Sequence, residues 1–468
     1  MPTANRGAPQ IHPSLAAKIP PLIPQKSHRA HPFGRKPSKL GARPASSARF
    51  AQCTTSRWSA RVDVNQAKCP IFKLKVFEFV PNFLHWLMVA VRQAPDWWER
   101  TMDIGLALSG GGFRAAAFHA GVLRRLANAG LFASIKQIST VSAGSLVISA
   151  IISRFGWPTD DDYEDIVFPE LGKLLTKTDL LSFRTLNKMG STISGYGIIF
   201  DRAKILENSL ESQWKVKGSL ADLPDYPTWW INATSLAPAK NWRFSKREMG
   251  DRKFGRHYNP KIKIATAAAA SAAFPYLIGA LKIGLPKDGW HRNDLATWAS
   301  MKRKRPPRAS VRLWDGGVYG TLGLEALFRP EGRLIDCDFL VCSDATRSIR
   351  RLIQSRGFVK AIERGEVRGS MVRLGDSVRD IDSRVKRRRA PANYDAFLRD
   401  EDVSAVARTQ TALTALTPDR FEAVARHGYE VADATLTAYW PQEFPISTLW
   451  PPMPPVVTTE RPAVEAKQ

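Results

Sequence analysis

The stretch Leu106–Leu126, LALSGGGFRAAAFHAGVLRRL, decides the fold class of this chain. Apolar residues lead into three glycines, and beyond the glycines apolar residues recur at helical spacing. This pattern predicts a strand over 103–109 that turns through Gly110–Gly112 directly into a helix over 113–130. Such a turn can hold an anion, because the free N–H groups and the helix dipole both face it.

Two phosphate-binding motifs are excluded at this turn. A P-loop requires Gly-Lys-Ser/Thr after the first glycines, and no such residues follow. A dinucleotide-binding turn requires a further glycine where Ala116 and Ala117 stand, and an acidic residue at the end of a second strand. The glycines therefore indicate either an oxyanion-binding loop or a simple turn.

A second strand-to-helix turn follows in Ile138–Ser145, ISTVSAGS, with Ser142 at its corner. A nucleophile elbow holds its serine in a strained backbone conformation and needs small neighbours, which Ala143 and Gly144 provide. The usual first glycine of an elbow is replaced by Thr140. An ordinary helix N-cap at Ser142 remains the alternative interpretation.

The middle of the chain alternates strand patterns with helix patterns, which predicts an α/β fold with a mainly parallel sheet. Further strands are predicted over 228–236, 241–247, 311–317 and 334–345, with helical patterns over 157–222 and beyond 345. The clearest helix is Thr417–Leu436, with Thr417 as its N-cap. In parallel sheets, ligands bind at the carboxyl ends of the strands.

The two ends of the chain differ in composition from its middle. The first acidic residue is Asp63, so the Pro-rich segment 1–65 is predicted to be a disordered basic arm. An apolar, aromatic entrance segment follows over 66–102, but charges and a proline interrupt it before it could span a membrane. No apolar core of a secretory signal is present, and a Pro-rich tail is predicted over 441–468.

The 468-residue chain has a formal net charge of +26, which favours an anionic partner such as phospholipid, nucleic acid or an acidic small molecule. The basic runs 302–308 and 384–389 are interpreted as solvated loops. The four cysteines form no CxxC motif, so neither a zinc site nor a redox pair is expected, and a reducing compartment is favoured.

A serine nucleophile needs a base, and two kinds of residue could provide it. His427 is the sole histidine late in the chain, but it lies within an amphipathic helix where packing is the simpler role, and His119 lies on the helix behind the glycines. Asp315 ends a predicted strand and precedes Gly316 and Gly317. A plain Asp-Gly-Gly turn is the alternative to a catalytic carboxylate.

Taken together, these segments resemble the patatin-like phospholipases. SGGGFRAAAFHAGVL is similar to the family's oxyanion loop, STVSAGS to its nucleophile elbow, and WDGGVYGTLGLE to its Asp-Gly-Gly block. INATSL, RFSKR and ASAAFPYL resemble intermediate segments in the same order, so the resemblance spans about 103–346. RHGYEVADATL resembles a segment that follows the core in bacterial members.

The resemblance implies a three-layer α/β/α fold with a mainly parallel central sheet, in which a serine and an aspartate catalyse hydrolysis without histidine. Ser142 would be the nucleophile and Asp315 the base. The expected oxyanion loop comprises Gly110, Gly111 and Gly112, and the expected supporting residues are Arg114, Gly144, Gly316 and Gly317. The catalytic domain is expected over 103–346, with insertions at about 157–222 and 285–310, and a helical extension over 347–440.

The expected activity is that of a serine lipid acyl hydrolase acting on phospholipid or lysophospholipid esters. Acyl transfer or thioester hydrolysis on the same site, and membrane binding without catalysis, are the alternatives. No metal or organic cofactor, nucleic acid or obligate protein partner is implied. We expect a cytoplasmic protein at the periphery of an anionic membrane surface.

Overall fold

A computed structural model describes residues 102–181, 197–275, 278–293, 301–346, 350–385, 394, 396–444 and 450–452. The predicted basic arm, nearly all of the entrance segment and most of the Pro-rich tail lie outside these described residues.

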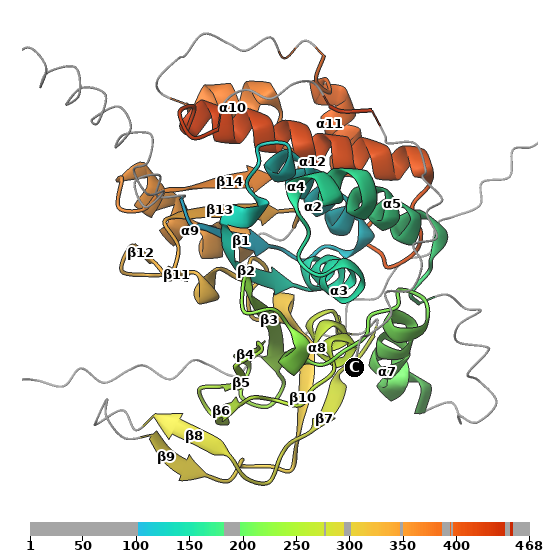
Figure 1. The fold of residues 1–468 in the computed structure, drawn as a ribbon, viewed down its shortest axis with the longest axis vertical. Helices are drawn as coiled ribbons and strands as arrows, with labels where there is room; N and C mark the ends of the chain where they lie inside the picture. The colour runs from blue at the N-terminus through green and yellow to red at the C-terminus, as the bar shows by residue number, and fades with distance from the viewer. Residues whose placement is uncertain are drawn as a thin grey trace, which may run out of the picture. The chain divides into compact units, whose positions relative to one another are not determined.

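Parallel strands form the centre of the sheet in the order β14–β13–β1–β2–β3, which Figure 1 shows following one another down the molecule. Their bounds are β1 Ile104–Leu108, β2 Ile135–Val141, β3 Thr228–Ser235, β13 Phe339–Asp344 and β14 Gly369–Arg373. The predicted mainly parallel sheet is therefore confirmed for this core.

Successive side chains of the core strands enter hydrophobic cores on opposite faces of the sheet, as strand geometry requires. Leu106 and Leu108 of β1 pack with the helices of one face, whereas Ala107 packs with α9 (Arg350–Glu363) on the other. Helices thus cover both faces, and the three-layer arrangement predicted from the sequence is confirmed.

An antiparallel extension continues the sheet beyond β3. Its strands are β4 Lys240–Phe244, β5 Glu248–Asp251, β6 Gly255–Tyr258, β8 Trp290–Asn293 and β9 Met301–Lys304. Two further antiparallel strands, β7 (Leu281–Gly284) and β10 (Ser310–Asp315), pair with each other, and β10 also pairs with β3. A separate short hairpin joins β11 (Phe328–Arg329) to β12 (Arg333–Leu334).

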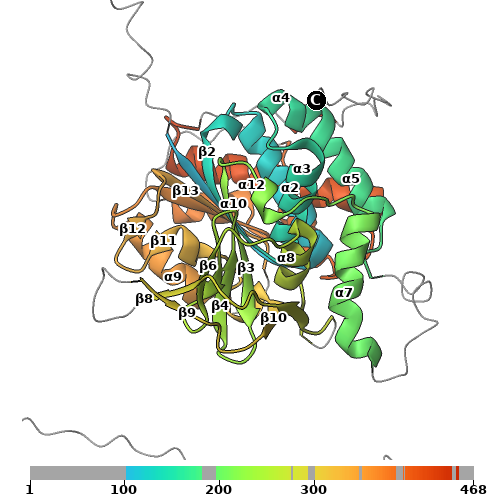
Figure 2. The same ribbon diagram turned by 60° about the horizontal axis from the view of Figure 1, so that its bottom comes forward.

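Helices flank the sheet, and two of them, α2 and α3, begin where the sequence predicted, after the glycine turn and after the turn at Ser142. Their bounds are α2 Gly112–Ala127, α3 Ala143–Phe155, α4 Asp160–Asp162, α5 Phe168–Lys177, α7 Gly197–Ser212, α8 Ile264–Ser271, α10 Val378–Arg384, α11 Asp400–Ala407 and α12 Pro418–Tyr439. Thr417 is the N-cap of α12, and its side chain accepts the Arg420 N–H, as the sequence predicted. In Figure 2, α8 lies beside β3 and β10, and α7 lies on the side of α8 away from β3.

Helices α2 and α12 pack against each other more closely than side chains would allow. A Cβ atom added at Gly121 would lie 1.8 Å from the carbonyl oxygen of Ala425, and one added at Gly428 would lie 2.2 Å from that of Phe118. The two glycines therefore let each helix backbone contact the other, which fixes α12 against the helix that begins at the glycine loop.

Two parts of the fold differ from the sequence-based expectation. The region beyond 345 was expected to be helical, but it also contributes β14, a strand at the edge of the parallel core. The basic run 302–308 was interpreted as a solvated loop, but its first residues belong to β9, which pairs with β8 and through it with β6.

Candidate active site

Ser142 lies at the sharp turn between β2 and α3. Its φ is 51° and its ψ is −115°, a conformation that residues other than glycine rarely adopt. Although Ser142 occupies the N-cap position of α3, its side chain makes no capping hydrogen bond. A Cβ atom at Gly144 would lie 2.7 Å from the Leu108 carbonyl oxygen, so glycine is needed for α3 to start this close to β1.

The strands β2 and β10 meet end to end along one edge of β3. β2 pairs with Thr228–Asn232, and β10 pairs with Ala233–Ser235. β4 pairs with Ile231–Ser235, which overlaps both segments, so β4 must occupy the other edge of β3. Because β10 is antiparallel to β3, the carboxyl ends of β2 and β10 point toward each other, which brings Ser142 and Asp315 together.

The Asp315 carboxylate is buried, with 4% of the residue exposed. It accepts the Gly317 N–H at 2.6 Å and a hydrogen bond from the Ser142 hydroxyl. Burial raises the pKa of Asp315 to about 6, and the two hydrogen bonds oppose this rise. Gly316 fits beside it because a Cβ atom there would lie 2.4 Å from the Asn232 carbonyl oxygen.

The glycine loop lies against Ser142. A Cβ atom at Gly110 would be 3.1 Å from the Cβ of Ser142. Gly111 has a φ of 139° and Gly112 a φ of 64°, so both adopt conformations that favour glycine. The Gly110 N–H donates to the Thr321 carbonyl at 3.2 Å.

The Gly110 N–H donates a hydrogen bond, but the N–H groups of Gly111 and Gly112 face no acceptor among the described residues. Gly111 is the N-cap of α2, which has no capping side chain. Within the part of the chain that the structure describes, no hydrogen-bond acceptor contacts either N–H group. Two free donors at the positive end of a buried helix are suited to stabilise an oxyanion.

Arg114 holds the glycine loop in place. Its guanidinium donates to the carbonyl oxygens of Ala345 at 3.0 Å, Thr409 at 3.1 Å and Ala407 at 3.4 Å. Ala345 follows β13, Ala407 is the last residue of α11, and Thr409 lies just after that helix. These contacts fit the supporting role expected for Arg114.

Two buried histidines are bonded to groups other than Ser142. His119 Nε2 donates to the Ser109 carbonyl at 2.9 Å, so its Nδ1 accepts from the Ser343 hydroxyl at 2.7 Å. His427 Nε2 accepts the Gly375 N–H at 3.0 Å. Burial lowers the pKa of both imidazoles to about 4, which favours their neutral forms.

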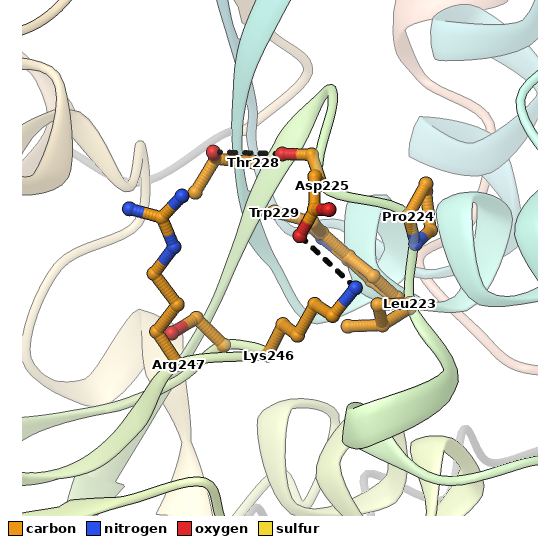
Figure 3. A pocket seen from close by; sticks show the side chains of 8 residues that line it. Leu223, Pro224, Asp225, Thr228, Trp229, Lys246 and Arg247 are labelled. Atoms are coloured by element: carbon orange, nitrogen blue, oxygen red, sulfur yellow. Dashed lines mark hydrogen bonds and ion pairs between the residues drawn. The ribbon is translucent and has the colours of Figure 1, made fainter.

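A shallow pocket lies at the opposite end of β3 (Figure 3). Thr228 and Trp229 line it from the start of the strand, and Lys246 and Arg247 from the turn after β4. Lys246 forms an ion pair with Asp225 at 3.0 Å. The described residues contain no group of three His, Cys, Asp or Glu side chains that could hold a metal ion.

Residues 106–328 match the family model described as patatin-like phospholipase. This match supports lipid hydrolase activity in general, and the fold is patatin-like. No curated protein matches the sequence.

Solved structures similar to this chain include the following three proteins. Human GIVD cytosolic phospholipase A2 has 14% identity and a TM-score of 0.46, over 73% of this chain and 63% of its own. VipD from Legionella pneumophila has 14% identity and a TM-score of 0.30, over 71% and 66%. ExoU of the ExoU–SpcU complex from Pseudomonas aeruginosa has 15% identity and a TM-score of 0.24, over 72% and 52%. This chain thus spans less than two thirds of each of these proteins.

Proposed function

We propose that this protein, which contains a patatin-like phospholipase domain in residues 106–328, hydrolyses carboxylic esters of lipids through Ser142 and Asp315. The observation that carries this proposal is the meeting of β2 and β10 along β3, which brings the Ser142 hydroxyl to a buried carboxylate whose pKa is raised by burial to about 6. Such a carboxylate is ionised near neutral pH and still basic enough to accept a proton as the hydroxyl oxygen attacks.

The first half of the reaction forms an acyl-enzyme. The Ser142 oxygen attacks the ester carbonyl carbon while its proton moves to Asp315. The carbonyl π electrons move to oxygen, and the N–H groups of Gly111 and Gly112 stabilise the oxyanion. The tetrahedral intermediate collapses, the bond to the alcohol breaks, and Asp315 returns the proton to the departing alkoxide.

The second half regenerates the enzyme. Asp315 takes a proton from a water molecule, whose oxygen attacks the acyl carbon. The bond to the Ser142 oxygen then breaks, and this oxygen recovers its proton from Asp315. This half releases the fatty acid and restores the Ser142 hydroxyl. The proton that Asp315 takes from the water is the one that it passes to the Ser142 oxygen.

We propose phospholipid or lysophospholipid as the substrate class, with the protein bound peripherally to an anionic membrane surface in the cytoplasm. The supporting observation is the net charge of +26, because basic residues are attracted to anionic lipid. Within the described ranges, no helix is both long and apolar enough to cross a membrane. Nucleic acid is not the proposed ligand.

The deciding experiment compares the wild-type protein with Ser142→Ala on short-chain esters, long-chain esters and defined phospholipids. We expect fatty acid release by the wild type alone. Adding an alcohol acceptor tests for acyl transfer, which would yield a new ester, and thioester substrates test for thioesterase activity. Equal behaviour of both proteins in every assay would contradict the proposal and favour a binding protein with this fold.

A further inference from the structure

The last residue of α8, Ser271, and Ala273 just beyond the helix contact the backbones of the two proposed catalytic residues. The Ser142 N–H donates to the Ser271 hydroxyl oxygen at 2.9 Å, and the Asp315 N–H donates to the Ala273 carbonyl at 2.8 Å. β2 and β10, which carry the two catalytic residues, do not pair with each other. The three residues from Ser271 to Ala273 therefore bind the backbones of both the proposed nucleophile and the proposed base, which come from separate strands.

The hydrogen bonds of Ser271 have a defined direction. Its hydroxyl contacts the Asn232 carbonyl at 2.6 Å, and since a carbonyl can only accept, Ser271 is the donor. Its oxygen then accepts both the Ser142 N–H and the Ser145 hydroxyl, which lies at 2.8 Å. Ser271 thus uses its single proton and both lone pairs.

The same logic fixes the direction of the bonds behind Ser145. Because the Ser145 proton goes to Ser271, the Ser145 oxygen accepts from the Thr140 hydroxyl at 2.8 Å. Thr140 in turn accepts the Trp229 indole N–H at 2.9 Å. The elbow position usually occupied by glycine is therefore filled by a threonine whose hydroxyl belongs to a buried, one-directional chain of hydrogen bonds.

Ser271 occupies the place where strand pairing along β3 changes from β2 to β10. Asn232 is the last β3 residue paired with β2, and Ala233 is the first paired with β10. The Ser271 hydroxyl satisfies the Asn232 carbonyl and the Ser142 N–H at this junction. Alanine would leave both groups and the Ser145 hydroxyl without this partner in a fully buried place.

The conformation of Ser142 gives this contact its importance. A positive φ outside glycine costs on the order of 1–3 kcal/mol and persists only where the surroundings hold it. We propose that Ser271 is a positioning residue, which holds the strained Ser142 backbone so that the nucleophile faces Asp315. This inference rests on the proposed function of the site.

Replacing Ser271 by alanine should lower kcat about 10- to 100-fold with little change in KM, because a small displacement of a nucleophile is costly while substrate contacts persist. The matched control is Ser149→Ala. Ser149 is equally buried on α3, but its hydroxyl bonds only locally, to the Leu146 carbonyl, so this variant should keep its kcat. Ser145→Ala leaves the bond between Ser142 and Ser271 in place and should fall between the two.

A pH profile separates positioning from general stability. The hydrogen bond from Ser142 holds down the pKa of Asp315, against the effect of burial. If Ser142 moves away in Ser271→Ala, the acidic limb of kcat/KM should shift to higher pH, whereas the limb of Ser149→Ala should stay in place. Should the alanine variant fail to fold, Ser271→Cys supplies the same measurement, because a thiol is a similar shape and a weak acceptor.

The outcomes distinguish this inference from the proposed function. A wild-type protein without ester hydrolysis, and without labelling of Ser142 by a fluorophosphonate, would contradict the proposed function. An active wild type with normal kcat and an unchanged acidic limb in folded Ser271→Ala would overturn the role of Ser271 alone. Loss of activity in proportion to loss of thermal stability across all three serine variants would also overturn it.

Discussion

The hydroxyl of Ser142 donates a hydrogen bond to the carboxylate of Asp315, which lies almost entirely out of water. This contact joins residues that are far apart in the sequence, and it predicts how activity should respond to pH.

The acidic limb of kcat/KM should lie near pH 6. Burial raises the pKa of Asp315 to about 6, and the carboxylate must be ionised to accept the Ser142 proton, so activity should fall as pH drops through this value. The pKa values of His119 and His427, at about 4, are too low to produce this limb. Measuring kcat/KM for a soluble ester across pH tests whether Asp315 produces the acidic limb. If the limb disappears in folded His427→Ala, the titrating group is His427 instead.

Asp315→Asn should remove nearly all turnover and make the protein more stable above pH 6. Burying an ionised Asp315 lowers the free energy of unfolding of the wild type. This loss is absent below pH 3.8, where the carboxyl is protonated in both the folded and the unfolded protein, and it is complete above about pH 6. Denaturant unfolding at about pH 8 should show a gain on the order of 1–3 kcal/mol, which vanishes at about pH 4. Near-normal turnover in the folded variant would reject Asp315 as the base.

Gly111→Val should reduce kcat on the order of 10²- to 10³-fold if the loop stabilises an oxyanion. Its φ is 139°, and a Cβ atom would lie 2.9 Å from the Ala115 Cβ, so the N–H groups must move. Gly130→Val is the control, because Gly130 also has a positive φ but has no neighbour within 4 Å of an added Cβ. The control should lose stability and retain kcat. An active, folded Gly111→Val protein would show that the loop is only a turn.

Gly121→Ala should destabilise the protein by roughly 2 kcal/mol or more, because the added methyl group would overlap the Ala425 carbonyl and force α2 away from α12. Gly284→Ala is the matched control, since nothing lies within 4 Å of an added Cβ and its φ is not positive. Thermal or denaturant unfolding of both variants measures the difference. Equal stability of the two would mean that α2 and α12 can separate without cost.

Phe274→Ser should weaken hydrolysis of vesicle lipid several-fold and spare a short, soluble ester. Phe274 is 56% exposed and follows Ala273, whose carbonyl holds the Asp315 N–H, so an aromatic ring is presented to solvent beside the site. Tyr226→Ser is the control, because Tyr226 is 64% exposed but precedes the opposite end of β3. Equal losses for both variants would exclude a specific role for Phe274.

The parallel core could be predicted because local patterns encode it. Each of the turns at Gly110–Gly112 and Ser142 joins a strand to a helix within a few residues, so its signature is short and continuous. The structure brings Ser142, Asp315 and the glycine loop together, as expected. Their catalytic roles remain predictions.

Other features depend on contacts that the sequence pattern does not show. Ser271 sits in an alanine-rich run where it reads as one more small residue, and its importance comes from partners on α3 and β3. β14 was missed because Gly369–Arg373 is short and follows a helix, so its strand character comes from pairing with β13. The one sequence feature that pointed to Ser271 was the ASAAFPYL segment, which contains it and resembles a segment of the patatin-like phospholipases.

The meeting of β2 and β10 along one edge of β3 has a consequence for how such a protein can diversify. The spacing between nucleophile and base depends on β3 and on the end of α8, and not on the lengths of the excursions that leave and return to them. The segment between β3 and α8 and the segment between β7 and β10 could therefore change in length while Ser142 and Asp315 keep their places.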